Sequence, residues 1–409
     1  MHSTSFGWRT PVVVVLGAAC LIAMLGFGTR GIYGFFLEPM TTARGWNRET
    51  FGFALALQNL VWGIMTPIAG ALAEKYGQPR VLGFGAIVAA FGLWSMTVVT
   101  DESMLYLAAG VIEGVGVGLT SFSLAMAAMA KVVRPERRSL ALGVCACFGS
   151  IGQMVFSPLS VTLIQTWGWE SAMVILACLT LGMLPLALLL PSGKAAELEE
   201  GTVQLSLRDA LNEAFAHRGY LLLNAGFFVC GFQIAFMMVH FPAYVTDIGF
   251  APQVGAYSLA LIGLANIAGT IIAGFAGQKF SKKNTLSVLY LGRGLWIIAL
   301  VTLPMSVSLM YALAVIMGLL WLAVVPLTTG IVGQIFGVRY MATLSGIVMF
   351  THQLGSFVGV WLGGWAYDQT GSYDLVWYLA IVLSFTAAAV HWPIDERPVA
   401  RLQEAQGAV

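Results

Sequence analysis

The chain has 409 residues, of which 58% are hydrophobic and 10% are charged, and its formal net charge is +1. Soluble domains carry about 45–50% apolar and about 25% charged residues. The composition therefore excludes an ordinary soluble protein and predicts a polytopic membrane protein. A net charge this close to zero gives no reason to expect a nucleic-acid partner.

The first apolar run, from about residue 11 to residue 37, bears on targeting. It is longer than the roughly 7–15 residues of a signal-peptide core and has no clear small-residue cleavage site. We therefore expect the run to be retained as the first membrane helix.

The five cysteines all lie inside apolar runs, and Cys145-x-Cys147 has no other metal-ligating residue close to it. The sequence thus predicts neither a disulfide framework nor a metal site. We also expect no cofactor. A phosphate-binding Gly-x4-Gly-Lys-Ser/Thr loop is absent from the sequence, which excludes ATP as the driving force.

Twelve apolar runs follow one another along the chain, separated by charged or turn-rich breaks. Each is close to the 20 or so residues that a membrane-spanning helix needs. The pattern predicts an all-α membrane protein with twelve transmembrane helices in two pseudo-symmetric six-helix bundles, 1–191 and 219–393. The widest break, 192–218, is expected to be a cytoplasmic linker, and 394–409 a cytoplasmic tail. Within the linker, Ser206-Leu-Arg-Asp209 is typical of a capped helix start.

Two charged loops in equivalent positions indicate an internal duplication. The first is Gly70-Ala-Leu-Ala-Glu-Lys-Tyr-Gly-Gln-Pro-Arg80, and its counterpart, Gly274-Phe-Ala-Gly-Gln-Lys-Phe-Ser-Lys-Lys283, begins 204 residues later. Leu55-Ala-Leu57 recurs at the same offset as Leu259-Ala-Leu261. Parallel repeats of this kind predict two related bundles with a substrate site between them.

The distribution of basic residues predicts the orientation in the membrane. With a cytoplasmic N-terminus, 16 of the 20 lysines and arginines fall on cytoplasmic breaks or tails, and only Arg44 and Arg48 fall on external ones. The positive-inside rule favours this arrangement, so we expect both termini in the cytoplasm. The remaining two, Arg30 and Arg293, lie within apolar runs.

The first charged loop resembles the signature between the second and third helices of the major facilitator superfamily. That signature reads Gly-x-Leu-Ala-Asp-Arg/Lys-x-Gly-x-x-Arg/Lys, and Glu74 replaces its aspartate while keeping the charge. Gly70 lets two helix backbones approach closely, and Gly77 permits a tight reversal with a positive φ. The resemblance implies a gating role for this loop and for the basic pair after the fourth helix, namely for Gly70, Glu74, Lys75, Gly77, Arg80, Arg137 and Arg138.

Other segments resemble bacterial carriers of the monocarboxylate-porter type within this superfamily. They include Thr29-Arg-Gly31, Gly45-Trp46 and His240-Phe-Pro-Ala-Tyr244, whereas the first-helix acidic pattern of the animal monocarboxylate carriers is absent. The resemblance implies a carrier of the bacterial cytoplasmic (inner) membrane that works by alternating access, with the first, fourth, seventh and tenth helices lining its cavity. It also implies a small organic anion as substrate, and we expect a monomer.

Charged side chains inside a bilayer cost roughly 2.5–3.5 kcal/mol each on insertion scales, so each one needs a reason. Arg30 lies in the outer half of the first helix, and Tyr33, three residues on, is expected on the same helical face. A guanidinium at this place can hold a carboxylate through two parallel hydrogen bonds. The alternative is a structural ion pair with an acid on a neighbouring helix.

Glu113 in the fourth helix and Arg293 in the ninth are the other two intramembrane charges. A desolvated carboxylate can couple proton movement to transport, whereas the alternative for Glu113 is a permanent salt bridge with Arg30 or Arg293. Antiporters of the superfamily usually have an Arg where this chain has Gly110 and a Gln where it has Glu113, which disfavours a drug antiporter. For Arg293 we expect structural support from a side chain that extends toward the cytoplasm, with substrate contact as the alternative.

Titratable and uncharged polar residues complete the predicted site. Histidines in the seventh and eleventh helices suit proton coupling or pairing with an anion, although a neutral histidine that packs helices is an equal alternative. Buried amides can line a cavity or bridge helices, and aromatic residues can enclose an organic substrate or pack. The predicted substrate-binding residues are Arg30, Tyr33, Gln233, His240, His352, Gln58, Asn266 and Trp321, and those for proton coupling are Glu113 and His352.

These observations predict a secondary active transporter that moves a small organic anion, a monocarboxylate, together with a proton. One alternative is a proton-coupled exporter of drugs or metabolites on the same fold, which would tolerate loss of Arg30. A membrane-embedded enzyme is a more distant one, because the sequence has neither a His-Glu-x-x-His nor a Gly-x-Ser-x-Gly motif. A nutrient sensor that keeps the carrier fold but transports little is the third.

Overall fold

A computed structural model of the protein describes residues 11–191, 206–337 and 340–407, and every element in these residues is a helix. The first part of the chain forms α1 (Val12–Arg30), α2 (Gly34–Arg44), α3 (Arg48–Tyr76), α4 (Gln78–Ser95), α5 (Glu102–Leu105), the π-helical η1 (Tyr106–Ile112), α6 (Glu113–Leu119), α7 (Phe122–Ala130), α8 (Pro135–Leu181) and α9 (Met183–Leu188). The second part forms α10 (Leu207–Ala216), α11 (Arg218–Asp247), α12 (Pro252–Lys279), α13 (Lys282–Thr302), α14 (Val307–Leu320), α15 (Val324–Phe336), α16 (Met341–Thr370), α17 (Asp374–His391) and α18 (Ala400–Gly407). The all-α prediction is confirmed.

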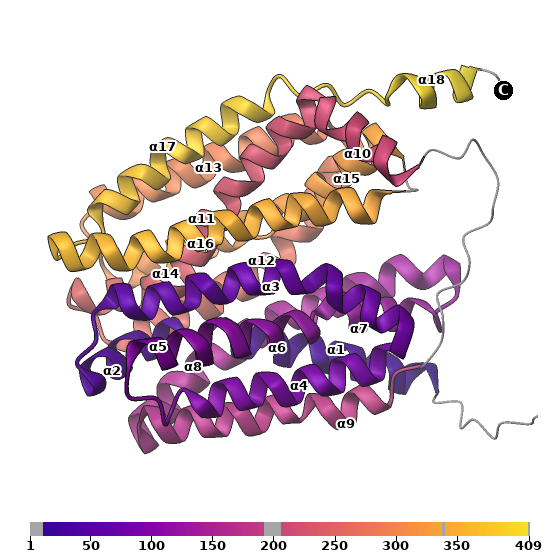
Figure 1. The fold of residues 1–409 in the computed structure, drawn as a ribbon. Coiled ribbons are helices and arrows are strands. Elements are labelled where there is room, and N and C mark those ends of the chain that lie inside the picture. The colour runs from indigo at the N-terminus through magenta and orange to yellow at the C-terminus, as the bar shows by residue number, and fades with distance from the viewer. Residues whose placement is uncertain (1–10, 192–205, 338–339, 408–409) are drawn as a thin grey trace, which may run out of the picture.

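Nine ranges of the described residues are long and apolar enough to cross a membrane. One of them, Ala141–Leu188, holds two helices joined at Gly168, where φ is 78°. The helices α4 and α16 run alongside these ranges and are further candidates (Figure 1). The protein is thus a multi-pass membrane protein, and the count of twelve crossings stays a prediction.

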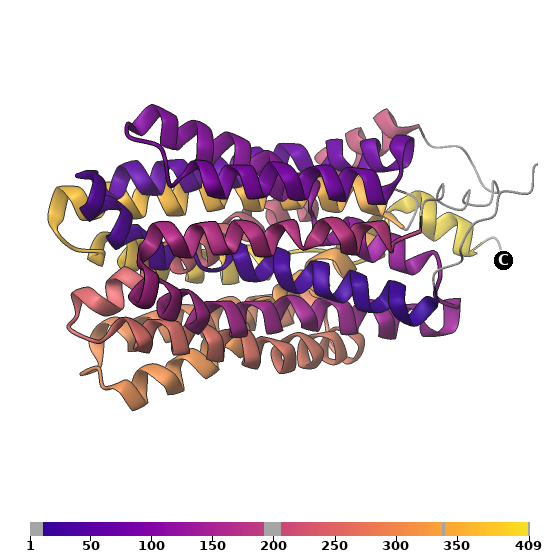
Figure 2. The same cartoon turned by 90° about the horizontal axis from the view of Figure 1, so that it is seen from below.

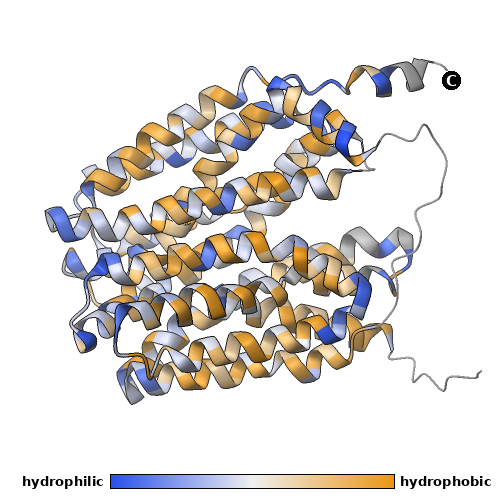
Figure 3. Ribbon diagram, in the orientation of Figure 1, coloured by the Kyte–Doolittle hydropathy of each residue, from blue (hydrophilic) through white to orange (hydrophobic). Residues whose placement is uncertain are grey.

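The two parts of the chain form two packed layers. Figure 1 shows α1 to α9 in the lower layer and α11 to α17 in the upper one, and Figure 2 shows the helices aligned along one common direction. We call each predicted membrane helix a rod, so that the first rod is α1 with α2, the fourth runs from α5 to α7, and the tenth is α14 with α15. Apolar residues dominate the middle of the rods, and hydrophilic residues gather at their ends (Figure 3). This distribution suits a bundle whose long axis crosses the bilayer.

The predicted linker, 192–218, lies partly outside the described residues, so the domain boundaries stay predictions. Its described part contains the expected capped helix, because Ser206 Oγ accepts a hydrogen bond from the backbone N–H of Asp209 at 3.2 Å. We call the end of the bundle that carries α10 and the turn at Gly77 the linker end. The opposite end, with the turn at 45–47, is the far end (Figure 1).

The charged loop at Gly77 has the geometry that its sequence predicts. The φ angle of Gly77 is 90°, and the side chains of Glu74, Lys75 and Arg80 are exposed at the linker end. Arg137 is exposed as well, whereas the side chain of Arg138 lies outside the described part of the structure.

One hydrogen bond beside this loop has a counterpart in the second half. In the first half, Lys131 Nζ donates to Gln78 Oε1 at 2.9 Å, joining the end of the fourth rod to the start of α4. In the second half, Lys282 Nζ donates to Gln334 Oε1 at 2.7 Å, joining the start of α13 to the end of α15. Residues 78 and 282 are 204 apart, and 131 and 334 are 203 apart. The same contact therefore recurs at the repeat offset with donor and acceptor exchanged.

Glycines set the first seam between the layers, which joins α3 to the antiparallel α16. A Cβ atom at Gly364 would lie 2.5 Å from the carbonyl oxygen of Arg48, and one at Gly52 would lie 3.0 Å from that of Val360. Farther along, a Cβ at Gly63 would lie 2.9 Å from the Cβ of Gln353. Small residues let helix backbones approach in this way, so the seam is closely packed from the far end to the middle of the bundle.

The second seam joins α8 to α12 and follows the same pattern. Gln153 Nε2 donates to the carbonyl of Leu259 at 3.4 Å, and Asn266 Nδ2 donates to Ser150 Oγ at 2.9 Å. A Cβ atom at Gly263 would lie 2.9 Å from the Ser150 carbonyl oxygen. Here too, contact extends from the far end to the middle.

Toward the linker end both seams open. The register of the first seam continues to Gly70 opposite Gly346, and that of the second to Gly143 opposite Gly274. A Cβ atom at any of these four glycines would meet no described atom within 4 Å outside its own helix backbone and chain neighbours. Gly70 and Gly274 are 204 residues apart, and Gly143 and Gly346 are 203 apart, so the four are pairwise equivalent in the repeat. The register of the seams places these glycines for close helix–helix contact, but the helices are not in contact there in this structure.

We predict that these glycines meet when the linker end closes. In a protein whose five native cysteines are replaced by serine, Gly70→Cys together with Gly346→Cys should form a disulfide under mild oxidation, detected by gel mobility. The control pair is Gly70→Cys with Gly17→Cys, because Gly17 lies on the exposed face of α1. Equal and negligible cross-linking in both pairs would contradict the prediction.

Candidate functional site

The first rod is broken where the predicted substrate contact lies. The helix α1 ends at Arg30, residues 31–33 form turns, and α2 begins at Gly34. The single helix expected through Arg30 and Tyr33 is therefore interrupted, although the two side chains still lie near each other. Interrupted helices at mid-membrane depth are typical of substrate sites in transporters.

Arg30 points to α3. Its Nη2 donates to Asn59 Oδ1 at 3.2 Å, and its guanidinium carbon lies 3.7 Å from the ring centroid of Trp62. Asn59 is itself held by a hydrogen bond from Nδ2 to the Leu55 carbonyl at 2.8 Å. None of the four ion pairs in the described residues includes Arg30. The described residues therefore do not contain the structural ion pair that was the alternative for Arg30. Its described partners are the amide of Asn59 and the indole of Trp62.

Tyr33 and Glu113 form a second polar pair close to Arg30. The tyrosine hydroxyl donates to Glu113 Oε1 at 2.6 Å, and Glu113 is only 2% exposed. Oε2 has no hydrogen-bond partner among the described residues. Gln58 is another polar neighbour of the Tyr33 hydroxyl, and its Nε2 is also without a described partner. Glu113 opens α6 directly after the π-helical η1, an irregularity often found at functional sites.

The tenth rod is also broken, and Arg293 closes the gap between α14 and α15. Nε and Nη2 of Arg293 donate to the Leu320 carbonyl at 3.2 and 2.8 Å, and Nη2 also donates to the Trp321 carbonyl. Arg293 is 0% exposed, so the expected extension of its side chain toward the cytoplasm is wrong. The guanidinium satisfies carbonyls that the break would leave unpaired in an apolar medium. Trp321 is buried at the same break.

Asn266 serves the other side of that break. Its Oδ1 accepts the backbone N–H of Leu322 at 2.9 Å, while its Nδ2 donates to Ser150 Oγ across the second seam. Asn266 was predicted to bind substrate. In the structure its amide joins the tenth rod to the opposite half of the molecule.

Two other predicted residues make hydrogen bonds that join helices of the second half, although Oε1 of Gln233 has no described partner. The ring nitrogens of His240 lie 2.8 Å from the Val360 carbonyl oxygen and 3.2 Å from the Tyr373 hydroxyl. Gln233 Nε2 donates to the Ala380 carbonyl at 3.0 Å and to Ser384 Oγ at 2.5 Å. These bonds join α11 to its neighbours, and no described contact brings either residue to Arg30.

His352 and its neighbour Gln353 lie on the α16 side of the first seam. The His352 ring is 4.9 Å from that of Phe227, and its Nδ1 has no described partner. His352 lies within electrostatic range of Arg30 and beside the Gln353 side chain. Gln353 is 1% exposed, and neither of its amide atoms has a described partner.

Reasoning from the sequence missed a polar cluster that closes the far end. Arg48 forms a bidentate ion pair with Asp247 at 2.6 and 2.8 Å, and its guanidinium lies 3.7 Å from the Tyr367 ring. Asp368 accepts the backbone N–H groups of Arg48 and Glu49 at 3.1 and 2.6 Å. A carboxylate of one half thus caps the N-terminus of α3 in the other. The sequence showed only that Arg48 is a basic residue on an external break.

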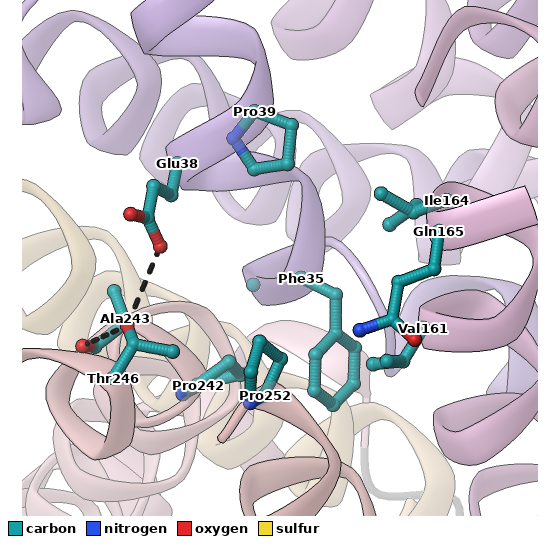
Figure 4. Close-up of a pocket in the computed structure, with 11 residues that line it drawn as sticks. Phe35, Glu38, Pro39, Val161, Ile164, Gln165, Pro242, Ala243, Thr246 and Pro252 are labelled. Atoms are coloured by element: carbon teal, nitrogen blue, oxygen red, sulfur yellow. Dashed lines mark hydrogen bonds between the residues drawn. The ribbon is translucent and has the colours of Figure 1, made fainter. Parts of the chain in front are cut away.

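A small cavity of about 90 Å³ also lies near the far end, between α2, α8, α11 and the start of α12 (Figure 4). Its walls are mainly apolar, with Phe35 and Pro242 among them. Glu38 points toward Thr246, whose hydroxyl donates to it at 3.4 Å. The cavity is lined by none of the predicted site residues, so we treat it as separate from the candidate site.

A duplicated helical bundle with two closely packed seams and interrupted helices is typical of a secondary transporter. Its central Arg30 has no ion-pair partner among the described residues. Comparison with known proteins agrees, because the family model of the Major Facilitator Superfamily matches residues 18–360 and 259–408. The chain belongs to the Major Facilitator Superfamily, whose members are transporters and not enzymes.

Individual relatives are similar over most of their length. Monocarboxylate transporter 13 of Rattus norvegicus is 25% identical over 383 residues, which cover 91% of this chain and 86% of the relative. The uncharacterized MFS-type transporter YcxA of Bacillus subtilis (strain 168) is 23% identical over 372 residues, covering 88% and 90%. Identities of this size leave the substrate to be argued from the site.

Solved structures share the fold. The crystal structure of a D-xylose-proton symporter matches with a TM-score of 0.72 at 16% identity, covering 94% of this chain and 98% of that one. A bacterial homolog of the human lysosomal transporter Spinster, in an inward-facing and unoccupied conformation, matches with a TM-score of 0.77 at 16% identity, covering 94% and 97%.

We predict that Arg293 stabilises the fold without contacting substrate. Arg293→Met leaves two buried carbonyls without donors, which should lower the free energy of unfolding by about 2 kcal/mol. The change is measured as a lower melting temperature in detergent, with Arg397→Met on the exposed tail as the control. A melting temperature equal to that of the control would contradict this structural role.

The cap from Asp368 should bias the protein toward the state closed at the far end. Removing an N-cap costs about 1 kcal/mol, so Asp368→Ala should raise the population open at that end about 5-fold. The readout is the rate at which an impermeant maleimide labels Thr50→Cys, a position 5% exposed near the start of α3. Asp101→Ala is the matched control, because Asp101 caps α5 within one half of the molecule. Equal labelling rates in the two variants would exclude the bias.

Proposed function

We propose that the protein carries a small organic anion, a monocarboxylate, across the bacterial cytoplasmic membrane together with a proton. The observation that carries the proposal is Arg30, a cation inside the bundle with no carboxylate partner among the described residues. A charge in this position is costly, and an incoming carboxylate would neutralise it through two hydrogen bonds. The names of the monocarboxylate transporters among the relatives support the same class of substrate.

The indole of Trp62 suits an anion with a short apolar part. The guanidinium carbon of Arg30 lies 3.7 Å from its ring centroid, and of the guanidinium nitrogens only Nη2 has a described hydrogen-bond partner. The Nε1 of Trp62 has no described partner. Arginine stacked in this way keeps its fork of donors. The site thus combines a carboxylate-binding group with an aromatic wall.

Glu113 is the proposed proton carrier. It is buried, has one donor in Tyr33, and has no basic partner among the described ion pairs. A carboxyl in such a place is neutral only while it holds a proton. Binding of an anion at Arg30 and a proton at Glu113 would leave both centres neutral, which favours movement of the occupied site. His352 remains the other candidate for this role.

We further propose that the linker end faces the cytoplasm, as the distribution of basic residues favours. In this orientation the structure is closed toward the outside by the Arg48 and Asp368 cluster, and its seams open toward the cytoplasm. The alternative function, export of drugs or metabolites, is one of the possible results of the test below.

The test is uptake of radiolabelled acetate, propanoate and butanoate into liposomes, with and without an inward proton gradient. Arg30→Gln should lower uptake at least about 10-fold, because a buried charge-assisted pair is lost. Glu113→Gln should abolish stimulation by the gradient while anion exchange at equal pH continues. Arg397→Gln on the tail is the control. Normal uptake by Arg30→Gln, or transport of lipophilic cations only, would overturn the proposal in favour of the exporter.

A further inference from the structure

We infer that Gln353 completes the substrate site from the second half of the molecule, by binding a hydroxyl, carbonyl or amide group on the anion that Arg30 holds. The inference rests on the proposed function and adds to it the chemistry of the rest of the substrate. It also assigns a function to Gln353, which is not among the substrate-binding residues predicted from the sequence.

The first observation is that this amide makes no hydrogen bond of normal geometry, although the neighbouring His352 interacts with it electrostatically. Gln353 is 1% exposed, and both Nε2 and Oε1 are without hydrogen-bond partners among the described residues. A side-chain amide has two donor hydrogens and one oxygen acceptor, and buried groups of this kind are nearly always satisfied. Among the other buried amides close to the seams, Gln153, Asn266 and Asn59 each make at least one hydrogen bond, whereas Nε2 of Gln58, near Tyr33, also has no described partner. The unused bonds of Gln353 point to a missing ligand.

The second observation is where the side chain lies. Its Cβ and Cγ would be 2.9 and 3.0 Å from a Cβ atom at Gly63, so it packs directly on the α3 backbone. Gly63 follows Trp62 and is one helical turn beyond Asn59, the two residues that hold Arg30. The Gln353 side chain thus lies against α3 about one helical turn from Asn59, at a place where α3 has no side chain. From there its amide would come within reach of an anion held by Arg30.

The chemistry of the two groups is complementary. Arg30 offers only donors, which suits a carboxylate, whereas the amide both donates and accepts, which suits a hydroxyl. An unsubstituted fatty acid would leave the amide unpaired, and a site built to hydrogen-bond a hydroxyl discriminates strongly against an analogue that lacks it. A substrate with both groups would join the two halves, which gives its binding a direct effect on how they pack.

The test compares butanoate with 2-, 3- and 4-hydroxybutanoate as competitors of labelled butanoate uptake. Wild-type protein should prefer at least one hydroxylated acid by about 10-fold in the concentration for half-inhibition. Gln353→Met, which keeps the size of the side chain, should lose this preference, so that the four acids reach half-inhibition at concentrations within about 2-fold of one another. Gln165→Met, which removes an exposed amide at the far end, is the matched control and should keep the preference.

A second variant gives the same readout by a different route. Gly63→Ala places a methyl group against the Gln353 side chain and should also remove the preference. It decides the matter if Gln353→Met does not reach the membrane. An unchanged ratio in either properly folded variant, or a wild type that does not distinguish the four acids, overturns the inference. If butanoate is not transported or Arg30→Gln has no effect, the proposed function has failed and this inference fails with it.

Discussion

The interior of a bilayer offers no water to a polar group, and the two intramembrane arginines meet this constraint in opposite ways. Arg293 binds within the protein, because its guanidinium donates hydrogen bonds to a backbone carbonyl at the break between α14 and α15. Arg30 has N–H donors that no described residue accepts, since its described partners are one amide oxygen and one indole face. The same side chain is therefore structural where the backbone needs donors and is free for a ligand where it does not.

The broken tenth rod is also connected to the seam between the halves. Asn266 holds the N–H of Leu322 on one side of its amide and Ser150 of the opposite half on the other. A shift of α8 against α12 therefore reaches the break through one side chain. Contiguous hydrogen bonds of this sort are a physical route by which motion at an interface can alter a site, and Trp321 lies at its end.

Much of the fold could be predicted from the sequence, because long apolar runs and the 204-residue repeat depend on local composition and spacing. The turn at Gly77 followed from the conformational freedom of glycine. Partners across the seams could not be predicted in this way. Nothing near Arg48 in the sequence indicates Asp247 or Asp368, since these acids lie about 200 and 320 residues away along the chain.

The candidate site was predicted in part. Charge inside a membrane helix predicts Arg30 and Glu113 as site residues, and in the structure both lie near Tyr33. Residue type alone could not separate amides that face a ligand from amides that join helices. Gln233 and Gln353 are alike in sequence terms, yet one is bonded to α17 and the other has no described partner. That difference depends on side-chain geometry, which only the packed bundle determines.

The exchanged hydrogen bonds at the linker end bear on how such duplicated proteins are compared. In one half a lysine on the fourth rod reaches a glutamine, and in the other a lysine at the start of α13 reaches a glutamine on α15. An alignment of the two halves scores both positions as mismatches, although the contact is identical in kind. The two halves have kept a hydrogen bond here without keeping the residues that form it. Sequence identity between the halves therefore underestimates how many of their contacts are alike.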